Sequence, residues 1–205
     1  MKVLLLNGSP RKNGNTFMAL EEVASVLNSH DVETEIMWIG NKPMQGCIAC
    51  GFCKKEGICV FPDGVYGELR EKLKTADGFI VGSPTYYAGP AGSLCALLDR
   101  LFYSSGQYLK GKPAAAVGIA RRGGAVATVQ RLNLYFEIIS MPVVTSQYWN
   151  LAFGAAPGEV KEDGEGMQTM RTLGHNMAKM LLAMDSIKDK FKIKEEAFER
   201  TNFIR

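Results

Sequence analysis

The sequence predicts an α/β fold whose core is a doubly wound, five-stranded parallel sheet with helices on both faces. Short apolar runs alternate with segments of helical periodicity along most of the 205 residues. The apolar runs are hydrophobic on both sides, which is typical of parallel strands covered by helices. Right-handed crossovers then make a doubly wound sheet the expected topology. Ligands bind such sheets beyond the carboxyl ends of the strands, so the loops that follow the strands should carry the function.

The five expected strands are short and are bounded by turn residues. Residues 2–6 and 78–81 are nearly continuous apolar runs, as fully buried strands require. Residues 32–39 alternate between apolar and polar side chains and end before Gly40. The fourth and fifth strands are expected at residues 114–119 and 142–146.

Five amphipathic helices should cover this sheet. Their apolar residues recur three and four positions apart, which gives each helix one inner face. They are expected at residues 15–28, 65–75, 91–103, 125–139 and 167–184. We therefore expect one domain over residues 1–187, with an irregular cysteine-rich insert at 41–64, followed by a charged docking tail at 188–205.

Composition excludes several classes of protein. A net charge of +3, without a basic run interleaved with aromatic residues, argues against nucleic acid as a partner. The apolar stretches have the length of strands, so we expect no membrane segment. The N-terminus has no signal-peptide layout, and a cytoplasmic location is the expectation.

The loop after the first strand, Asn7 to Thr16, has the features of a phosphate site. It leads directly into a helix, whose first N–H groups lack intrahelical partners and carry partial positive charge. Two glycines would let the backbone close around an anion. Charged, hydroxyl and amide side chains add donors at Ser9, Arg11, Lys12, Asn13, Asn15 and Thr16.

This loop matches neither the G-x-G-x-x-G fingerprint of dinucleotide sites nor the Gly-Lys-Ser/Thr ending of a P-loop. A terminal monophosphate is therefore favoured over a dinucleotide or a triphosphate. The alternative is an ordinary strand-to-helix turn in which Asn15 or Thr16 caps the helix.

Loops of similar character follow the third and fourth expected strands. The first contains two prolines, two glycines and the adjacent Tyr86 and Tyr87. Adjacent tyrosines do not both face one core, so at least one should be free to stack on a planar ring, unless they cover the sheet edge. The second loop, Arg121 to Gly124, places two cations before a flexible helix entry. All three loops should meet at one edge of the sheet.

Together these motifs resemble the flavodoxin-like, NADPH-dependent FMN reductase family. The resemblance covers residues 1–182 and is carried by Gly8-Ser9-Pro10-Arg11 with Gly14-Asn15-Thr16, Ser83-Pro84-Thr85-Tyr86, Leu98-Asp99-Arg100 and Gly123-Gly124. It implies a flavodoxin-like fold in which the first loop binds the FMN phosphate, the second borders the isoalloxazine and the third closes the other flank. The implied cofactor-binding residues are Ser9, Arg11, Asn13, Gly14, Asn15, Thr16, Ser83, Pro84, Thr85, Tyr86, Tyr87, Arg121, Gly123 and Gly124. It also implies a homodimer or homotetramer with the flavin near the subunit boundary.

Four of the five cysteines are crowded into the insert, at Cys47, Cys50, Cys53 and Cys59. Such crowding favours metal or redox chemistry over disulfides. The spacing resembles the cluster motif of the iron–sulfur flavoproteins, a branch of the same superfamily, which implies a [4Fe–4S] cluster close to the FMN. Four thiolates also suit tetrahedral zinc, although the usual paired knuckles with a long spacer are absent. Free or redox-active thiols are the third interpretation.

The combined interpretation is an FMN-dependent oxidoreductase. Reduced nicotinamide, NADH or NADPH, would deliver hydride to the flavin, which would pass electrons to a small-molecule or protein acceptor. If a cluster is present, a ferredoxin-like protein would be an alternative electron donor. The competing interpretations are a quinone or nitroaromatic reductase and a non-enzymatic carrier resembling flavodoxin, although such a carrier would usually be acidic.

Several other residues are expected to be structural. His30 and His175 should cap helices or lie on the surface, and Asp99 and Arg100 should form an ion pair within or between subunits. Cys95 falls in an apolar helical pattern and should be an inert core thiol.

Overall fold

The computed structural model describes residues 1–61, 63–191, 196, 197, 199 and 201. Its sheet has five parallel strands in the order β2-β1-β3-β5-β6. These are β1 (Lys2–Asn7), β2 (Glu33–Trp38), β3 (Gly78–Tyr86), β5 (Ala114–Ala120) and β6 (Leu151–Phe153). The short strand β4 (Gly89–Pro90) pairs antiparallel with the end of β3. The chain winds outward from the centre in both directions, which confirms the predicted doubly wound, flavodoxin-like fold.

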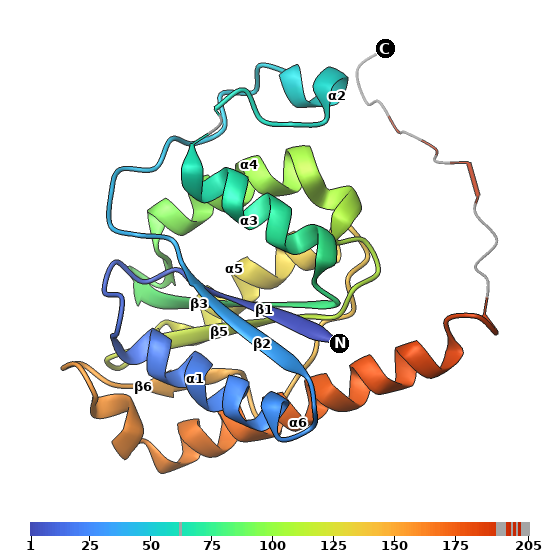
Figure 1. Cartoon of the computed structure of the whole chain (residues 1–205). Helices are drawn as coiled ribbons and strands as arrows, with labels where there is room; N and C mark the ends of the chain where they lie inside the picture. Colours follow the sequence, from blue (N-terminus) through green and yellow to red (C-terminus); the bar gives the residue numbers. More distant parts are fainter. Residues whose placement is uncertain (62, 192–195, 198, 200, 202–205) are drawn as a thin grey trace.

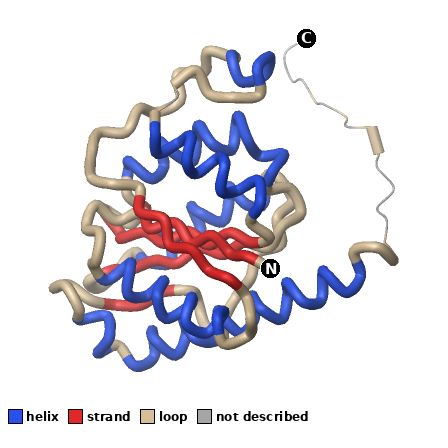
Figure 2. The backbone as a smooth tube through the Cα atoms, in the orientation of Figure 1, coloured by secondary structure: helices blue, strands red, loops and turns tan. Residues whose placement is uncertain are grey.

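Helices cover both faces of the sheet (Figures 1 and 2). One face carries α3 (Gly64–Thr75), α4 (Gly92–Ser105) and α5 (Ala125–Glu137). The other carries α1 (Asn15–Asn28) and α6 (Gly164–Ile187). Short 3₁₀ turns lie at Gly106–Tyr108 and Glu159–Glu162. The result is a three-layer α/β/α arrangement.

The strands divide their side chains between two hydrophobic cores. Leu4 and Leu6 of β1 pack on the α3–α4–α5 side, whereas Leu5 packs on the α1–α6 side. Phe79 and Ile80 of β3 alternate in the same way and are fully buried. Burying each such side chain is worth about 1.5–3 kcal/mol, so the central strands hold the loops at their ends on a rigid base.

The expected fifth strand is wrong. In residues 142–146 the sheet makes only one isolated bridge, between Ala114 and Val143, and the fifth strand is β6 instead. The chain leaves the sheet because side-chain amides, and not a neighbouring strand, donate hydrogen bonds to its backbone carbonyls. Asn150 donates to Val144 C=O at 3.1 Å, and Asn176 donates to Thr145 C=O at 2.7 Å. With only three residues, β6 is too short to show the alternation of apolar and polar residues that predicts a strand.

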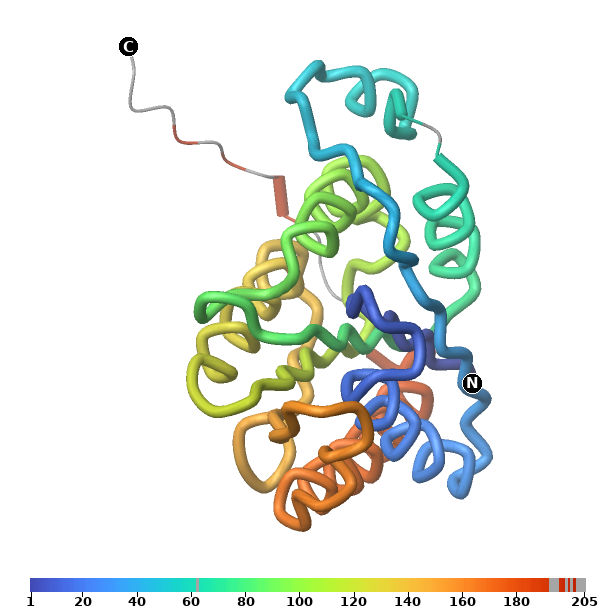
Figure 3. Tube along the Cα trace, turned by 90° about the vertical axis from the view of Figure 1, so that its left-hand side faces the viewer, coloured from blue at the N-terminus to red at the C-terminus, as the bar shows by residue number. Residues whose placement is uncertain are grey.

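The cysteine-rich insert and the end of the chain complete the fold. The insert is irregular, as expected, except for the short helix α2 (Phe52–Glu56), and it projects beyond α3 and α4 as the cyan segment of Figure 3. Of the predicted docking tail at 188–205, residues 192–195, 198, 200 and 202–205 lie outside the described residues. Among the described helices, none is long and apolar enough to cross a membrane.

Candidate functional site

A cavity of about 250 Å³ opens at the carboxyl ends of the central strands. The loops after β1, β5 and β6 and the carboxyl ends of β3 and β5 contribute to its wall. The lining residues are Ser9, Arg11, Gly14, Asn15, Thr16, Pro84, Thr85, Tyr86, Ile119, Ala120, Arg121, Gly154 and Ala155. The three loops singled out from the sequence therefore meet at one edge of the sheet.

Hydrogen bonds shape the loop after β1. Asn7 is buried and bridges the loop: its Oδ1 accepts from Ser9 N–H at 3.1 Å, and its Nδ2 donates to Lys12 C=O at 2.9 Å. Gly8 N–H donates to Gly82 C=O of β3 at 2.9 Å. Trp38, at the end of β2, donates its indole N–H to Ser9 C=O at 2.7 Å. The loop is thus fixed to β1, β2 and β3.

The start of α1 offers donors to this cavity. Its N-cap, Gly14, has no side chain, and within the described residues no side chain caps the helix. The first turn contains no acidic residue. The hydroxyl of Ser9 accepts from Arg11 N–H at 3.1 Å, which sets the direction of the backbone that carries the Arg11 side chain. Free helix N–H groups beside an arginine form an anion site.

Asn15 holds a second loop against the cavity. Its Nδ2 donates to Ala156 C=O, and its Oδ1 accepts from Gly158 N–H, both at 2.9 Å. A Cβ at Gly154 would lie 2.8 Å from Asn15 Nδ2, so only glycine permits this approach. Glu159 accepts from the N–H groups of Ala156 and Ala155, and these bonds lower the pKa of Glu159. The Asn15 amide therefore positions the loop at 154–158, and its phosphate contact stays a prediction.

The loops after β3 and β5 support one another. Gly124 has φ +87°, and a Cβ there would lie 2.9 Å from the Cα of Ala88. The hydroxyl of Thr128, on α5, donates to the hydroxyl of Thr85 at 3.0 Å. Tyr86 lines the cavity and is half exposed, while Tyr87, at the tip with φ +50°, is fully exposed. One of the two tyrosines thus faces the cavity.

Five of the predicted binding residues do not line the cavity: Asn13, Ser83, Tyr87, Gly123 and Gly124. Ser83 is fully buried, where it donates to Pro84 C=O at 2.8 Å and accepts from Ala91 N–H at 3.0 Å. Sequence reasoning missed four lining residues: Ile119, Ala120, Gly154 and Ala155. The last two were missed because the fifth strand was placed too early; the Gly-Ala-Ala-Pro-Gly run at 154–158 was the available signal.

A second cavity, of about 200 Å³, lies within the insert. All four clustered thiols line it, together with residues of α4. The lining residues are Cys47, Ile48, Ala49, Cys50, Gly51, Cys53, Lys54, Cys59, Val60, Phe61, Arg100 and Tyr103. The two cavities share no lining residue among those described. The thiols and the loops singled out for the flavin therefore line different hollows, and a cluster close to the FMN stays a prediction.

The donor set of this second cavity fits a thiolate-bound metal group. Ala49, Gly51 and Gly57 have φ values of 53–72°, which wind the chain around the hollow. Four thiols without a carboxylate or imidazole in the described lining suit an iron–sulfur cluster or zinc. Within the described residues, no three cysteine, histidine or acidic side chains converge closely enough to hold a metal ion. The four thiols thus line one cavity without converging on a single point.

Asp99, Arg100 and Cys95 of α4 were expected to be structural. The expected Asp99–Arg100 ion pair does not form within the chain: Arg100 pairs with Asp63, and Asp99 accepts from the hydroxyl of Tyr135. Burial and this carboxylate raise the pKa of Tyr135. Burial also raises the pKa of the half-buried Cys95 thiol.

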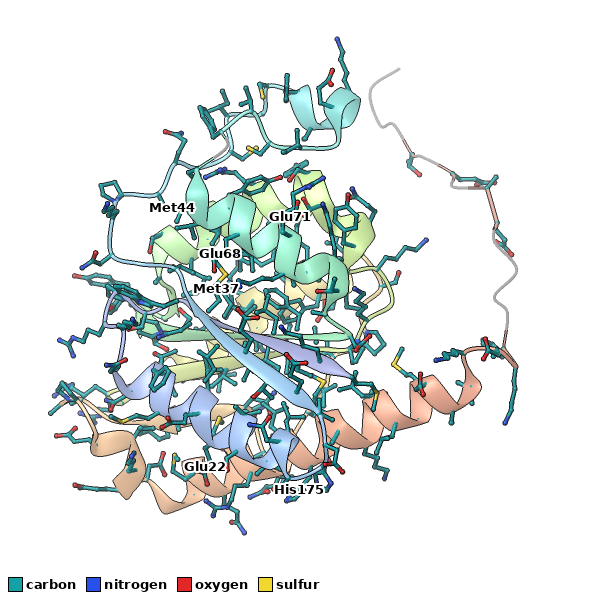
Figure 4. The ribbon with its side chains drawn as sticks, viewed as in Figure 1. Glu22, Met37, Met44, Glu68, Glu71 and His175 are labelled. Carbon is teal, nitrogen blue, oxygen red and sulfur yellow. The ribbon has the colours of Figure 1, made fainter. Side chains whose placement is uncertain are left out.

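The two histidines lie at the surface, as predicted. His30 Nε2 and His175 Nδ1 are 2.8 Å apart, and His175 lies on α6 on the face of the molecule away from the insert (Figure 4). Within the described residues, no metal site forms there.

Comparisons with known proteins identify the family of the chain. The model of the NADPH-dependent FMN reductase family matches residues 1–156. An iron-sulfur flavoprotein of Methanocaldococcus jannaschii is 39% identical over 189 residues, covering 88% of this chain and 97% of that protein. One from Methanosarcina thermophila is 33% identical over 196 residues, covering 93% and 100%.

The fold agrees with a solved flavoenzyme, the NAD(P)H:(acceptor) oxidoreductase of Paracoccus denitrificans. That structure has a TM-score of 0.65 at 18% identity and covers 89% of this chain and 97% of its own. At this identity the likeness concerns the fold alone. The sequence relatives carry the assignment: the chain belongs to the NADPH-dependent FMN reductase family, in its iron–sulfur flavoprotein branch, and is an FMN-dependent oxidoreductase.

Proposed function

We propose that FMN binds in the cavity at the carboxyl ends of the strands, with its phosphate at the start of α1. The observation that carries this proposal is the phosphate loop, which is held open by Asn7 and Trp38 and is lined by helix N–H groups and Arg11. Thr85 and Tyr86 would border the ring, and Arg121 would close the opposite wall. When bound, the flavin supplies hydride and single-electron chemistry. The protein's part is to bind, orient and shield it.

We further propose that Cys47, Cys50, Cys53 and Cys59 hold a [4Fe–4S] cluster. The support is the shared cavity, its four-thiol donor set and the family branch to which the chain belongs. Zinc and free thiols are the competing outcomes, and metal analysis separates them.

The electron partners follow from this pairing of cofactors. We propose NADPH or NADH as the hydride donor, a ferredoxin-like protein as a single-electron donor through the cluster, and a small molecule or protein as acceptor. We also propose a cytoplasmic homodimer or homotetramer. Light scattering of the purified protein checks the subunit number.

The decisive experiment is cofactor analysis of anaerobically purified protein. Mass analysis should find FMN, and FAD as the main flavin would contradict the phosphate site. Reconstitution with iron and sulfide should load about four irons per chain, as a four-thiolate cubane requires. Cys50→Ala should lose this iron, while the matched variant Cys95→Ala, outside the cavity, should keep it. Equal iron in wild type and Cys50→Ala would refute the cluster.

A further inference from the structure

We propose that Arg100 is a positioning residue for the cysteine site, holding Cys59 through an N–H···S hydrogen bond and fixing the insert to α4. The inference rests on the cluster proposed above. Arg100 Nε donates to Cys59 Sγ at 3.4 Å. The arginine is only 1% exposed, although it contacts an insert in which no described residue is fully buried. It lines the cysteine cavity and is not among the described residues that line the flavin cavity.

The guanidinium reaches both ends of the cysteine run. Before the first cysteine, its Nη1 donates to Gln45 C=O at 3.2 Å and lies 3.8 Å from Met44 Sδ. Figure 4 shows Met44 where the insert leaves the domain. After the last cysteine, Nη2 donates to Phe61 C=O at 2.5 Å. The planar guanidinium of an arginine has several donors and can join the two ends of a loop in this way. The single ammonium group of a lysine cannot.

The charge of Arg100 is compensated within the domain. Its Nη1 pairs with Asp63, whose other carboxylate oxygen caps α3 by accepting from Tyr66 N–H at 2.8 Å. The guanidinium also stacks over the rings of Tyr66 and Phe61, at 5.0 and 5.8 Å from their centroids. A buried arginine is tolerated only with such pairing, and removing it takes the ion-pair partner from Asp63 and this donor from the insert carbonyls.

Cys59 is held by a second contact as well. Its backbone N–H donates to the Tyr66 hydroxyl at 3.1 Å, and that hydroxyl lies 2.6 Å from Ser104 Oγ on α4. Both its thiol and its backbone are therefore attached to the folded domain. Cys47 and Cys50, by contrast, are exposed. Among the described contacts, Cys59 is the one of the four thiols that the domain holds before any metal arrives.

Two consequences follow for the loaded site. A hydrogen bond to a ligating sulfur withdraws negative charge from it, which raises the reduction potential of a cluster. Anchoring of Cys59 also slows loss of iron. Arg100→Met should therefore lower the potential of the cluster and release iron to a chelator at least about tenfold faster, the scale expected for losing a hydrogen bond to a charged group.

The test compares reconstituted wild type, Arg100→Met, Arg100→Lys and Arg70→Met. Arg70 is the matched control because it also contacts the insert, donating to Gly57 C=O at 3.3 Å, but makes no hydrogen bond to a thiol among the described residues. Redox titration followed by electron paramagnetic resonance should give wild-type potentials in Arg70→Met and more negative potentials in both Arg100 variants. The lysine variant should retain more iron than the methionine variant, because it keeps the charge opposite Asp63. FMN content should be the same in all four proteins.

The outcomes separate the two proposals. If wild type takes up no iron, the cluster proposal fails, and this inference fails with it. If wild type loads iron and both Arg100 variants keep its potential and its rate of iron release, only the role of Arg100 is refuted. A purely structural role would speed iron release without moving the potential of the remaining cluster, and that result would refute the hydrogen bond to the ligating sulfur. If Arg100→Met does not fold, Arg100→Lys carries the same comparison.

Discussion

The proposed phosphate loop (residues 7–16) and the cysteine insert proposed to hold a metal (residues 41–64) are built in opposite ways. The loop is tied to three neighbouring strands by Asn7, Gly8 and Trp38. Ser9, Arg11 and Thr16 of this loop line the cavity. The insert is attached to the domain by side-chain contacts of Arg100, Tyr66 and Arg70. Among the described residues its thiols do not converge. If both proposals hold, the first site is organised before its ligand arrives, whereas the second is completed by its ligand.

The difference has an energetic meaning. In a preorganised site little binding free energy is lost in ordering the chain. The free energy of a direct contact that is removed therefore appears almost fully as a loss of affinity. A site that closes around a metal couples binding to local folding, and its anchor matters as much as its ligands. Substitutions in the loop should therefore act on flavin affinity or on the whole domain. Those in the insert should act on metal retention.

The largest expected effect is on flavin affinity. Arg11→Ala should weaken FMN binding by about 10- to 100-fold, because it removes a charge-assisted contact to the phosphate worth about 1.5–3 kcal/mol. Fluorescence titration of the flavin-free protein measures this. Lys55→Ala, which removes a positive charge from the insert, should leave FMN affinity unchanged. Equal losses in the two variants would mean that only general charge attraction is at work.

A somewhat smaller effect is expected on stability. A Cβ at Gly8 would lie 2.5 Å from Leu94 Cδ2 and 2.9 Å from Gly82 C=O, so Gly8→Ala should lower the free energy of unfolding by about 1–3 kcal/mol through overpacking. Gly46→Ala in the insert, where the nearest atom is 4.0 Å away, should change it by less than about 0.5 kcal/mol. Denaturant unfolding followed by circular dichroism measures both changes in the free energy of unfolding. Equal destabilisation would show that the insert is as tightly coupled to the core as the loop.

The sequence predicted the first of these regions better than the second, for a physical reason. The phosphate loop and α1 are local: the strand, the turn and the helix at residues 15–28 follow one another in the chain, and α1 has the predicted bounds. The role of Trp38 was missed because its bond to Ser9 crosses from one strand end to another. A pattern of neighbouring residues in the sequence does not predict a contact between residues that are far apart in the chain.

Arg100 shows the same limit in the insert. From sequence it was assigned to its neighbour Asp99, yet adjacent residues of a helix do not face each other. Its partners, Asp63 and Cys59, lie about forty positions earlier in the chain. Four clustered cysteines were visible as a motif. Only the fold shows that the buried face of α4 carries the arginine to the cavity that these cysteines line.

The smallest expected effect concerns Trp38 and tests whether the phosphate loop is fixed in advance. Trp38→Phe keeps an aromatic ring near Lys12 but removes the indole N–H that donates to Ser9 C=O at 2.7 Å. Losing one neutral hydrogen bond should cost about 0.5–1.5 kcal/mol, which lowers FMN affinity about two- to tenfold. The matched control is Trp149→Phe, because Trp149 is 54% exposed and does not line the flavin cavity. Iron content should be the same in both variants. Wild-type FMN affinity in Trp38→Phe would mean that Asn7 and Gly8 suffice to hold the loop, and that the link to β2 adds nothing to its preorganisation.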